Sequence, residues 1–160
     1  MTSSDPAPPG TRRSVRRQQP RVTYVIARLE RAMRRQLDEA VRPHGVTTPQ
    51  YAALVELELR AGQSNAQLAR RTFMTPQSMS EVVKALETKG LVSREADSSH
   101  GRLIRIDLTP EGERVLTACD EAVDTVEGQM LRELTQRDRE QLLADLKSCV
   151  RMLGAGFAEG

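Results

Sequence analysis

Residues 64–108 decide the fold, and they read SNAQLARRTFMTPQSMSEVVKALETKGLVSREADSSHGRLIRIDL. The stretch begins with Ser64 and, three residues later, Gln67. This is the spacing of a capping box, in which the two side chains accept hydrogen bonds from each other's backbone amides. The pair therefore predicts a short helix, which ends near Phe73.

A second, longer helix is expected directly after the first. Thr75 predicts its N-cap, and Pro76 takes the first helical position, where the missing N–H of proline costs nothing. Gly90 predicts its end, because glycine readily adopts the left-handed conformation needed after the last turn. A short helix, a tight connection and a longer capped helix make a helix-turn-helix.

The two faces of this second helix differ in polarity. At about 100° per residue, the apolar side chains share one arc and must face the core: Met79, Val82, Val83 and Leu86. The opposite face is polar and consists of Gln77, Glu81, Lys84 and Thr88. A recognition helix presents such a face to the major groove, with the residues near its N-terminus closest to the bases. The alternative is an ordinary amphipathic helix with a solvated outer face.

A β-hairpin pattern follows the second helix. One strand is expected from Leu91 through Arg94, a turn over 96–101, and a returning strand over 102–108. In the returning strand charged residues alternate with apolar ones, as in a half-buried strand: Ile104, Ile106 and Leu108. Arg102 can reach a minor groove or a phosphate, because its planar guanidinium suits both. The hairpin makes the motif a winged helix-turn-helix.

Further helices are expected on both sides of this motif. Apolar residues at helical spacing predict them over 22–41, from Thr48 to about Arg60, from Thr109-Pro110 through Met130, and from Thr135 to Leu153. So small a lobe cannot bury the apolar stripes of the terminal helices, which are therefore expected to pack against a second subunit. The expected fold class is mainly α with a small β-hairpin wing (α+β). Residues 21–42 and 110–160 would form a two-fold dimerisation domain around a DNA-binding lobe of residues 43–109.

Several short motifs share their order and spacing with a known family. They are His44-Gly45-Val46-Thr47-Thr48-Pro49-Gln50-Tyr51 ahead of Leu54, Leu68-Ala69, Leu86-Glu87-x-Lys89-Gly90-Leu91-Val92-x-Arg94, Asp97, Arg102, and Leu108-Thr109-x-x-Gly112. From about Val22 to Leu153 the chain resembles the multiple antibiotic resistance regulator (MarR) family of bacterial transcription factors. Two positions depart from the family pattern. His100 stands where the wing usually carries an acidic residue, and Glu81 stands where the recognition helix often carries an arginine.

The resemblance implies two kinds of site. The expected contacts to double-stranded DNA, a pseudo-palindromic operator bound by a homodimer, are Thr75, Gln77, Ser78, Ser80, Glu81, Lys84, Arg94, His100 and Arg102. Family members often bind effectors between the dimer helices and the DNA-binding lobe. A small aromatic or anionic effector would there meet Tyr24, Arg28, His44 and Tyr51. For the three rings among these, ordinary helix packing is the alternative.

Composition and missing motifs narrow the choice of function. The net charge of +2 is too small to indicate a polyanionic partner by itself. Residues 1–20 predict a disordered basic arm, which could follow DNA phosphate or have no fixed role. The sequence shows no apolar run of membrane-spanning length and no signal peptide, so a cytoplasmic location without a membrane is expected. Without metal-ligand spacing, a phosphate loop or a nucleophile elbow, we expect no metal, no cofactor and no enzymatic activity.

The leading hypothesis is a dimeric repressor that a small-molecule ligand releases from operator DNA. Two alternatives stay open on the sequence alone. One is a redox-responsive DNA-binding regulator acting through Cys119 and Cys149, although cysteines in helices are usually small buried hydrophobes. The hydroperoxide-sensing branch of the family uses a cysteine in the first helix, where this chain has none. The other alternative is a winged-helix interaction module without DNA specificity.

Overall fold

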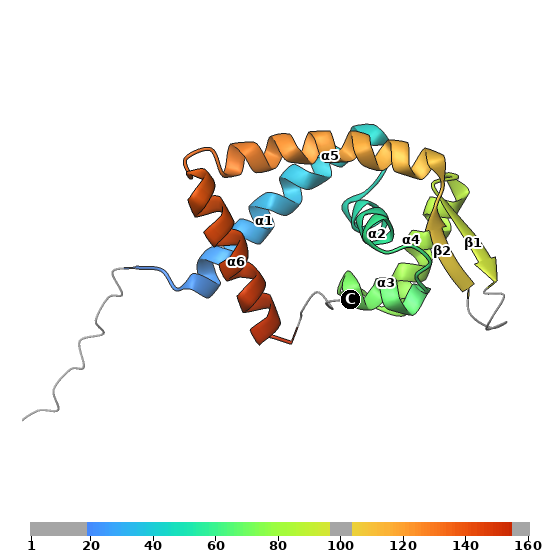
Figure 1. Cartoon of the computed structure of the whole chain (residues 1–160), viewed down its shortest axis with the longest axis horizontal. Helices are drawn as coiled ribbons and strands as arrows, with labels where there is room; N and C mark the ends of the chain where they lie inside the picture. Colours follow the sequence, from blue (N-terminus) through green and yellow to red (C-terminus); the bar gives the residue numbers. More distant parts are fainter. Residues whose placement is uncertain (1–18, 97–103, 155–160) are drawn as a thin grey trace, which may run out of the picture.

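A computed structural model describes residues 19–96 and 104–154, and its helices and strands follow the predicted order. The elements are α1 (Val22–Val41), the 3-10 helix η1 (Arg42–His44), α2 (Thr48–Leu59), α3 (Asn65–Arg71), α4 (Pro76–Thr88), β1 (Val92–Ala96), β2 (Ile104–Leu108), α5 (Pro110–Met130) and α6 (Gln136–Met152). In Figure 1, α2, α3, α4 and the hairpin form a lobe at one end, and α5 runs from it toward α6. The predicted fold class is confirmed, although α3 ends at Arg71, two residues before Phe73.

Polar side chains cap the helices where the sequence predicts them. Ser64 caps α3 in a complete capping box, and the hydroxyl of Thr75 caps α4. Before α2, Thr47 forms a further capping box with Gln50, a pair that was not predicted. These side chains satisfy amide donors that lack a partner within the first helical turn, so each helix start is fixed by local sequence.

The end of α4 is fixed by Gly90, as predicted. Its φ of 70° lies in the left-handed region. The Gly90 amide donates to the Glu87 carbonyl at 2.9 Å, and the Leu91 amide donates to the Leu86 carbonyl at 3.0 Å. These two bonds form a Schellman motif, and the burial of Leu91 completes it. The chain therefore passes from the end of α4 directly into the wing.

The wing is an antiparallel hairpin in which Val92 of β1 lies opposite Leu108 of β2. The connection between α2 and α3 joins its edge, because the Ile106 amide donates to the Gln63 carbonyl at 2.9 Å. The predicted alternation of buried residues holds only in part. Ile106 is 1% exposed, whereas Ile104 is 51% exposed. Ile104 pairs with Ala96 at the end of the described ladder farthest from the Val92–Leu108 pair, where the helices cover the strands less.

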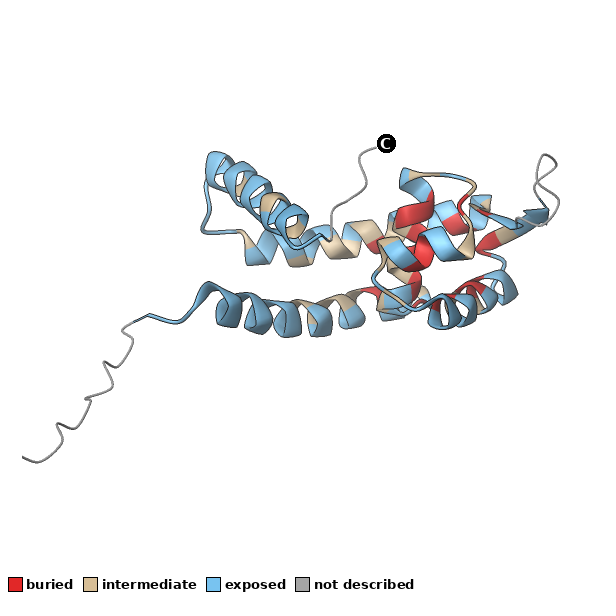
Figure 2. Cartoon of the chain, turned by 90° about the horizontal axis from the view of Figure 1, so that it is seen from below, coloured by how far each residue is buried: buried red, intermediate tan, exposed pale blue. Residues whose placement is uncertain are grey.

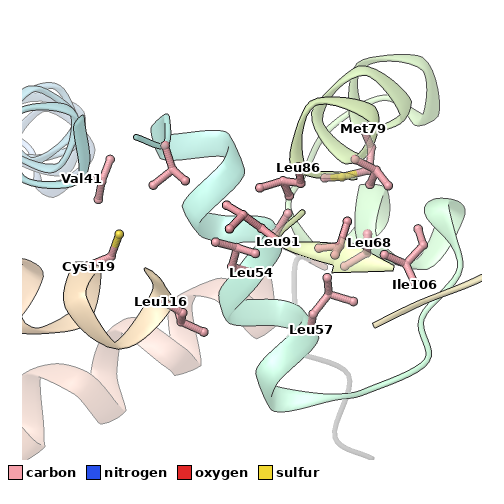
Figure 3. Close-up of a cluster of buried hydrophobic side chains, with 14 of the residues drawn as sticks. Val41, Leu54, Leu57, Leu68, Met79, Leu86, Leu91, Ile106, Leu116 and Cys119 are labelled. Carbon is pink, nitrogen blue, oxygen red and sulfur yellow. The ribbon is translucent and has the colours of Figure 1, made fainter. Parts of the chain in front are cut away.

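The hydrophobic core lies inside the lobe and extends to the adjoining part of α5. Buried positions gather at this end of the molecule in Figure 2. Figure 3 shows side chains from α2, α3, α4, the wing and α5 meeting there. The largest fully buried ones include Leu54, Leu68, Met79, Leu86, Ile106 and Leu116. On the predicted core face of α4, only Val82 is less than fully buried.

Apolar side chains on the outer helices remain exposed in the single chain. α6 has no buried residue, and its Leu142 and Leu146 are each 37% exposed. Both line a groove of about 690 Å³ whose walls also include Ile26 and Leu29 of α1 and Met130 of α5. A contiguous apolar surface of this kind is typical of an interface. The winged lobe leaves these stripes uncovered, as the sequence suggested.

The start of α5 lies very close to the end of α4. The Thr109 amide donates to the Leu91 carbonyl at 3.1 Å, and the Thr109 hydroxyl donates to the Gly90 carbonyl at 2.7 Å. A Cβ atom at Gly112 would overlap the carbonyl oxygen of Leu91. Position 112 therefore requires glycine, because the Leu91 carbonyl oxygen occupies the space that a Cβ atom would need.

We expect Gly112→Ala to lower the free energy of unfolding by about 2–3 kcal/mol, because the methyl group would push α5 away from a backbone atom that cannot yield. Glu121→Ala is the control, since Glu121 is exposed on the same helix and its truncation should cost less than about 0.5 kcal/mol. Urea denaturation of both variants gives the comparison. Equal stabilities of Gly112→Ala and the parent protein would show that α5 can move away from the Leu91 carbonyl at little cost.

Candidate DNA-binding face and effector site

The outer face of α4 is fully open to solvent. Gln77, Glu81 and Lys84 are all exposed. In the described residues, no hydrogen bond or ion pair holds these three side chains. Because the buried face of α4 fixes the helix, the three side chains can contact a partner without breaking a hydrogen bond or ion pair to the part of the chain that the structure describes.

The hydroxyls at the start of α4 are partly occupied by the helix cap. The Thr75 hydroxyl accepts from the Ser78 amide at 3.1 Å and donates to the Ser78 hydroxyl at 2.9 Å. Thr75 therefore has no donor left, whereas the hydroxyl hydrogen of Ser78 is still free. Ser80 is exposed on the first turns of the same helix. The N-terminal end of a helix also attracts phosphate through its amides and dipole.

The wing contributes one described residue of the expected DNA contacts. The Arg94 Nε lies 3.3 Å from Glu87 Oε2, so this guanidinium is shared with the end of α4. His100 and Arg102 lie outside the described residues. Arg94 and Lys84 are the described cations among the residues predicted to contact DNA.

A different cluster joins the lobe to the long helix α5. The Tyr51 hydroxyl of α2 donates to the Asp120 carboxylate of α5 at 2.7 Å. Burial, and then this hydrogen bond and the Asp120 charge, raise the pKa of Tyr51 well above its ordinary value. The phenol therefore remains a donor at neutral pH and ties α2 to α5.

The four residues predicted for an effector do not form one cluster in the single chain. Tyr24 and Arg28 lie near the start of α1, where the guanidinium carbon lies 6.0 Å from the ring centroid. His44 and Tyr51 lie beyond the other end of α1. At 1.5 Å per residue the two pairs are separated by roughly 20–25 Å along the helix. One chain therefore leaves Tyr24 and Arg28 distant from His44 and Tyr51, whose elements η1 and α2 both contact α5.

The two cysteines differ in their surroundings, and neither is in a disulfide. Cys119 is buried, whereas Cys149 is exposed, so the expected burial is wrong for Cys149 in the single chain. α6 packs too little of its surface against the chain to cover it. Burial, followed by the Asp120 charge, raises the pKa of Cys119. A raised pKa keeps this sulfur in the unreactive thiol form.

Two other features of the described ranges bear on function. No group of three or more histidine, cysteine or acidic side chains within residues 19–96 and 104–154 could hold a metal ion. In the same ranges, no helix combines the length and the apolar character needed to cross a membrane.

Two residues near these sites were not predicted. Asp120 is 69 positions from Tyr51 in the chain, and nothing in its local sequence distinguishes it from the other acids on α5. Phe73, between α3 and α4, is 72% exposed. The one feature of the sequence that could have drawn attention to Phe73 is the presence of a phenylalanine in a polar turn.

The geometry defines a winged helix-turn-helix protein whose recognition helix is open to solvent, and comparisons with known proteins narrow this class. Residues 44–103 match the model of the MarR family. The chain is 33% identical over 128 residues to the HTH-type transcriptional repressor Rv2887 of Mycobacterium tuberculosis, covering 78% of this chain and 92% of that protein. The protein belongs to the MarR family of DNA-binding transcriptional regulators, a family of regulators and not of enzymes.

Solved structures show the same fold. The crystal structure of the Mycobacterium tuberculosis MarR family protein Rv2887 in complex with p-aminosalicylic acid matches with a TM-score of 0.68 and 28% identity, over 81% of this chain and 98% of that one. A MarR family regulator from Rhodococcus sp. RHA1 matches with a TM-score of 0.74 and 24% identity, over 80% and 92% of the two chains. The second match bears on the fold alone.

We expect Tyr51→Phe to lower the free energy of unfolding by about 1 kcal/mol at neutral pH, because Asp120 loses its donor at a partly exposed site. The folded-state pKa of Tyr51 is raised. Its contribution is therefore fully present below about pH 10 and is lost as the pH rises further. By about pH 10.5 the difference between the two proteins should narrow by roughly 0.5 kcal/mol, after discounting for solvent screening.

Urea denaturation at neutral pH and at about pH 10.5 measures the difference in unfolding free energy between the parent protein and Tyr51→Phe. Tyr24→Phe makes the same chemical change on a ring that is 57% exposed, and its effect should stay within about 0.5 kcal/mol. Parallel pH dependence in the parent protein and Tyr51→Phe would contradict the role given to the hydrogen bond.

Proposed function

We propose that this protein is a dimeric repressor that binds operator DNA through two copies of α4 and is released by a small aromatic carboxylate. The observation that carries the proposal is the outer face of α4, where Gln77, Glu81 and Lys84 project with no hydrogen-bond or ion-pair partner among residues 19–96 and 104–154. Such a face is suited to reading base edges in a major groove. The relative with 33% identity is named a transcriptional repressor, which supports repression over activation for this protein. Acting on chromosomal DNA, the protein would work in the cytoplasm as a regulator without catalytic activity.

The side chains on α4 have distinct roles in this proposal. Gln77 can pair with adenine and Lys84 with guanine, while Glu81 can accept a hydrogen bond from the amino group of cytosine. The hydroxyls of Ser78 and Ser80 would donate to the DNA backbone near the helix start, and Thr75 would do so on giving up its bond to the Ser78 hydroxyl. These contacts would position the helix, and the three longer side chains would supply preference between bases.

The wing would add affinity that does not depend on sequence. Arg94 could reach phosphate once it separates from Glu87, and this exchange is inexpensive because the ion pair is partly exposed. His100 and Arg102, which lie between β1 and β2 in the sequence, are proposed for phosphate or the minor groove, where an arginine meets concentrated negative potential. The arginines of residues 1–20, all of which lie outside the described residues, could extend this contact along the DNA phosphates.

Dimerisation would cover the exposed apolar stripes of α1, α5 and α6. The groove between these helices is lined mainly by apolar side chains, including Leu142 and Leu146. Residues 21–42 and 110–160 would thus form the dimer domain, and residues 43–109 the DNA-binding lobe. A two-fold dimer places two recognition helices about one DNA turn apart, at roughly 34 Å, on a pseudo-palindromic operator.

The effector would act where α2 meets α5. The relative named above was crystallised with p-aminosalicylic acid, an aromatic carboxylate. In this chain, a carboxylate arriving at Tyr51 would compete with Asp120 for the phenolic hydrogen. Replacing that internal bond loosens the lobe from α5, which favours a different separation of the recognition helices. His44 lies in the same region, whereas Tyr24 and Arg28 could take part only if the second subunit supplied them.

The redox alternative has little physical support. Cys119 is buried with a raised pKa, and Cys149 lies on another helix without a disulfide partner. A sensing cysteine needs a thiolate that solvent can reach, which the buried Cys119 does not offer, so the alternative would depend on the exposed Cys149 alone. A winged-helix module without DNA specificity is likewise disfavoured, because the chain belongs to a family of DNA-binding regulators.

The first experiment tests dimerisation. Leu142→Glu should yield a monomer at micromolar concentration by sedimentation, because the substitution places a charge in the apolar groove. Its operator affinity should fall by about 100-fold or more, since the two half-sites are no longer bound together. Ala144→Glu introduces the same charge on the opposite, exposed face of α6 and should remain dimeric. Dimers of equal stability in both variants would refute the proposed interface.

The second experiment tests the regulator itself, using the duplex that the full-length protein enriches from a randomised library. We expect binding to weaken steeply with salt, and p-aminosalicylate to release the duplex. The matching carboxamide should not release it, because it lacks the anionic group that competes with Asp120. Asp120→Asn should respond at lower effector concentration, since the repelling charge is gone. Release by peroxide, and not by the carboxylate, would transfer the function to the redox alternative.

A further inference from the structure

Phe73 combines two unfavourable features. Its φ of 55° lies in the left-handed region, and it is the one non-glycine residue with positive φ in the described part of the chain. That conformation is disfavoured for a residue with a Cβ, which crowds the neighbouring carbonyl. Its ring is also 72% exposed, so burial does not offset the strain. Glycine would suit this position better for stability alone.

The residues on both sides hold the backbone of Phe73 in place. The Thr72 hydroxyl donates to the Leu68 carbonyl at 2.8 Å. The Met74 amide donates to the Ala69 carbonyl at 2.9 Å, and its side chain packs against the core. With its neighbours turned inward, Phe73 is directed outward at a fixed point of the turn. The ring is therefore presented to solvent by a rigid support.

The surroundings of the ring indicate what it contacts. Phe73 lies two residues before Thr75, the N-cap of the recognition helix. The exposed Arg70 lies three residues earlier, in the last turn of α3. The side-chain amide of Asn65 donates to the Pro76 carbonyl at 2.8 Å, which fixes α3 against the start of α4. An exposed ring that is close in sequence to an exposed cation and to the start of the recognition helix suits a partner that is both anionic and locally apolar.

We infer that Phe73 makes an apolar contact with the C5-methyl group of a thymine at the edge of each operator half-site. Phenylalanine is one of the side chains that read this methyl group in the major groove. The inference rests on the proposed function and adds a determinant of base preference that lies outside α4. A second copy of the chain is a weaker candidate for this contact, because the exposed apolar groove lies between α1, α5 and α6, away from this turn (Figure 1).

The test uses three variants of the full-length protein and the enriched duplex described above. Phe73→Gly and Phe73→Asn both tolerate a positive φ and both remove the ring. Each should unfold at a higher urea concentration than the parent while binding the duplex about tenfold more weakly, the value of losing one buried aromatic contact. Phe73→Leu keeps an apolar group and should retain most of the affinity.

Single thymines in the duplex are then replaced by uracil, which lacks only the methyl group. One symmetry-related pair of positions should weaken binding by the parent about fourfold per half-site, as expected for one buried methyl group. The same replacement should leave binding by Phe73→Gly unchanged. Equal binding of every uracil duplex by the parent, or unchanged affinity in Phe73→Gly, would overturn the inference while leaving DNA binding intact. A parent protein that binds no duplex would overturn both this inference and the proposed function.

Discussion

The backbone of Leu91 is the point on which the arrangement of the molecule depends. Its amide bonds to Leu86 at the end of α4, and its carbonyl accepts the Thr109 amide just before α5. Gly112 approaches the same carbonyl so closely that no larger residue fits. The recognition helix, the wing and the long helix α5 thus meet at one residue. These contacts would transmit a change in the tilt of α5 to α4, and they would link the proposed effector site beside α5 to the outer face of the recognition helix.

The parts of the fold that were predictable from the sequence are those encoded within a few residues. Ser64, Thr75 and Gly90 mark helix boundaries through hydrogen bonds to their own neighbours, so their types and spacing suffice. The contacts that were not predicted join distant segments. The close approach of Gly112 to Leu91 and the bond from Tyr51 to Asp120 depend on how helices pack, and periodicity carries no information about that.

The candidate sites also contain some features that local sequence predicts and others that depend on contacts between distant segments. Exposure of the polar face of α4 follows from helical periodicity, and the structure places Gln77, Glu81 and Lys84 outward as predicted. Three of the four predicted effector residues are polar-tipped rings near helices that family members use, and neither this property nor their positions in the sequence specify the distances between them. The length of α1 separates Tyr24 from His44, a constraint that appears only when the helix is straight and continuous. The strain at Phe73 is equally invisible in the sequence, because it is a property of the backbone.

The freedom of the outward side chains on α4 has an evolutionary consequence. Since the exposed side chains of Gln77, Glu81 and Lys84 form no hydrogen bond or ion pair with the described residues, substitutions there should leave the folded state almost unaffected. The buried face of α4, with Met79, Val83 and Leu86, keeps the helix in place regardless. A gene duplicate could therefore acquire a new set of target promoters by a few surface changes, without first gaining extra stability. Diversification of such regulators would be limited by the co-evolution of their operators and not by the tolerance of the scaffold.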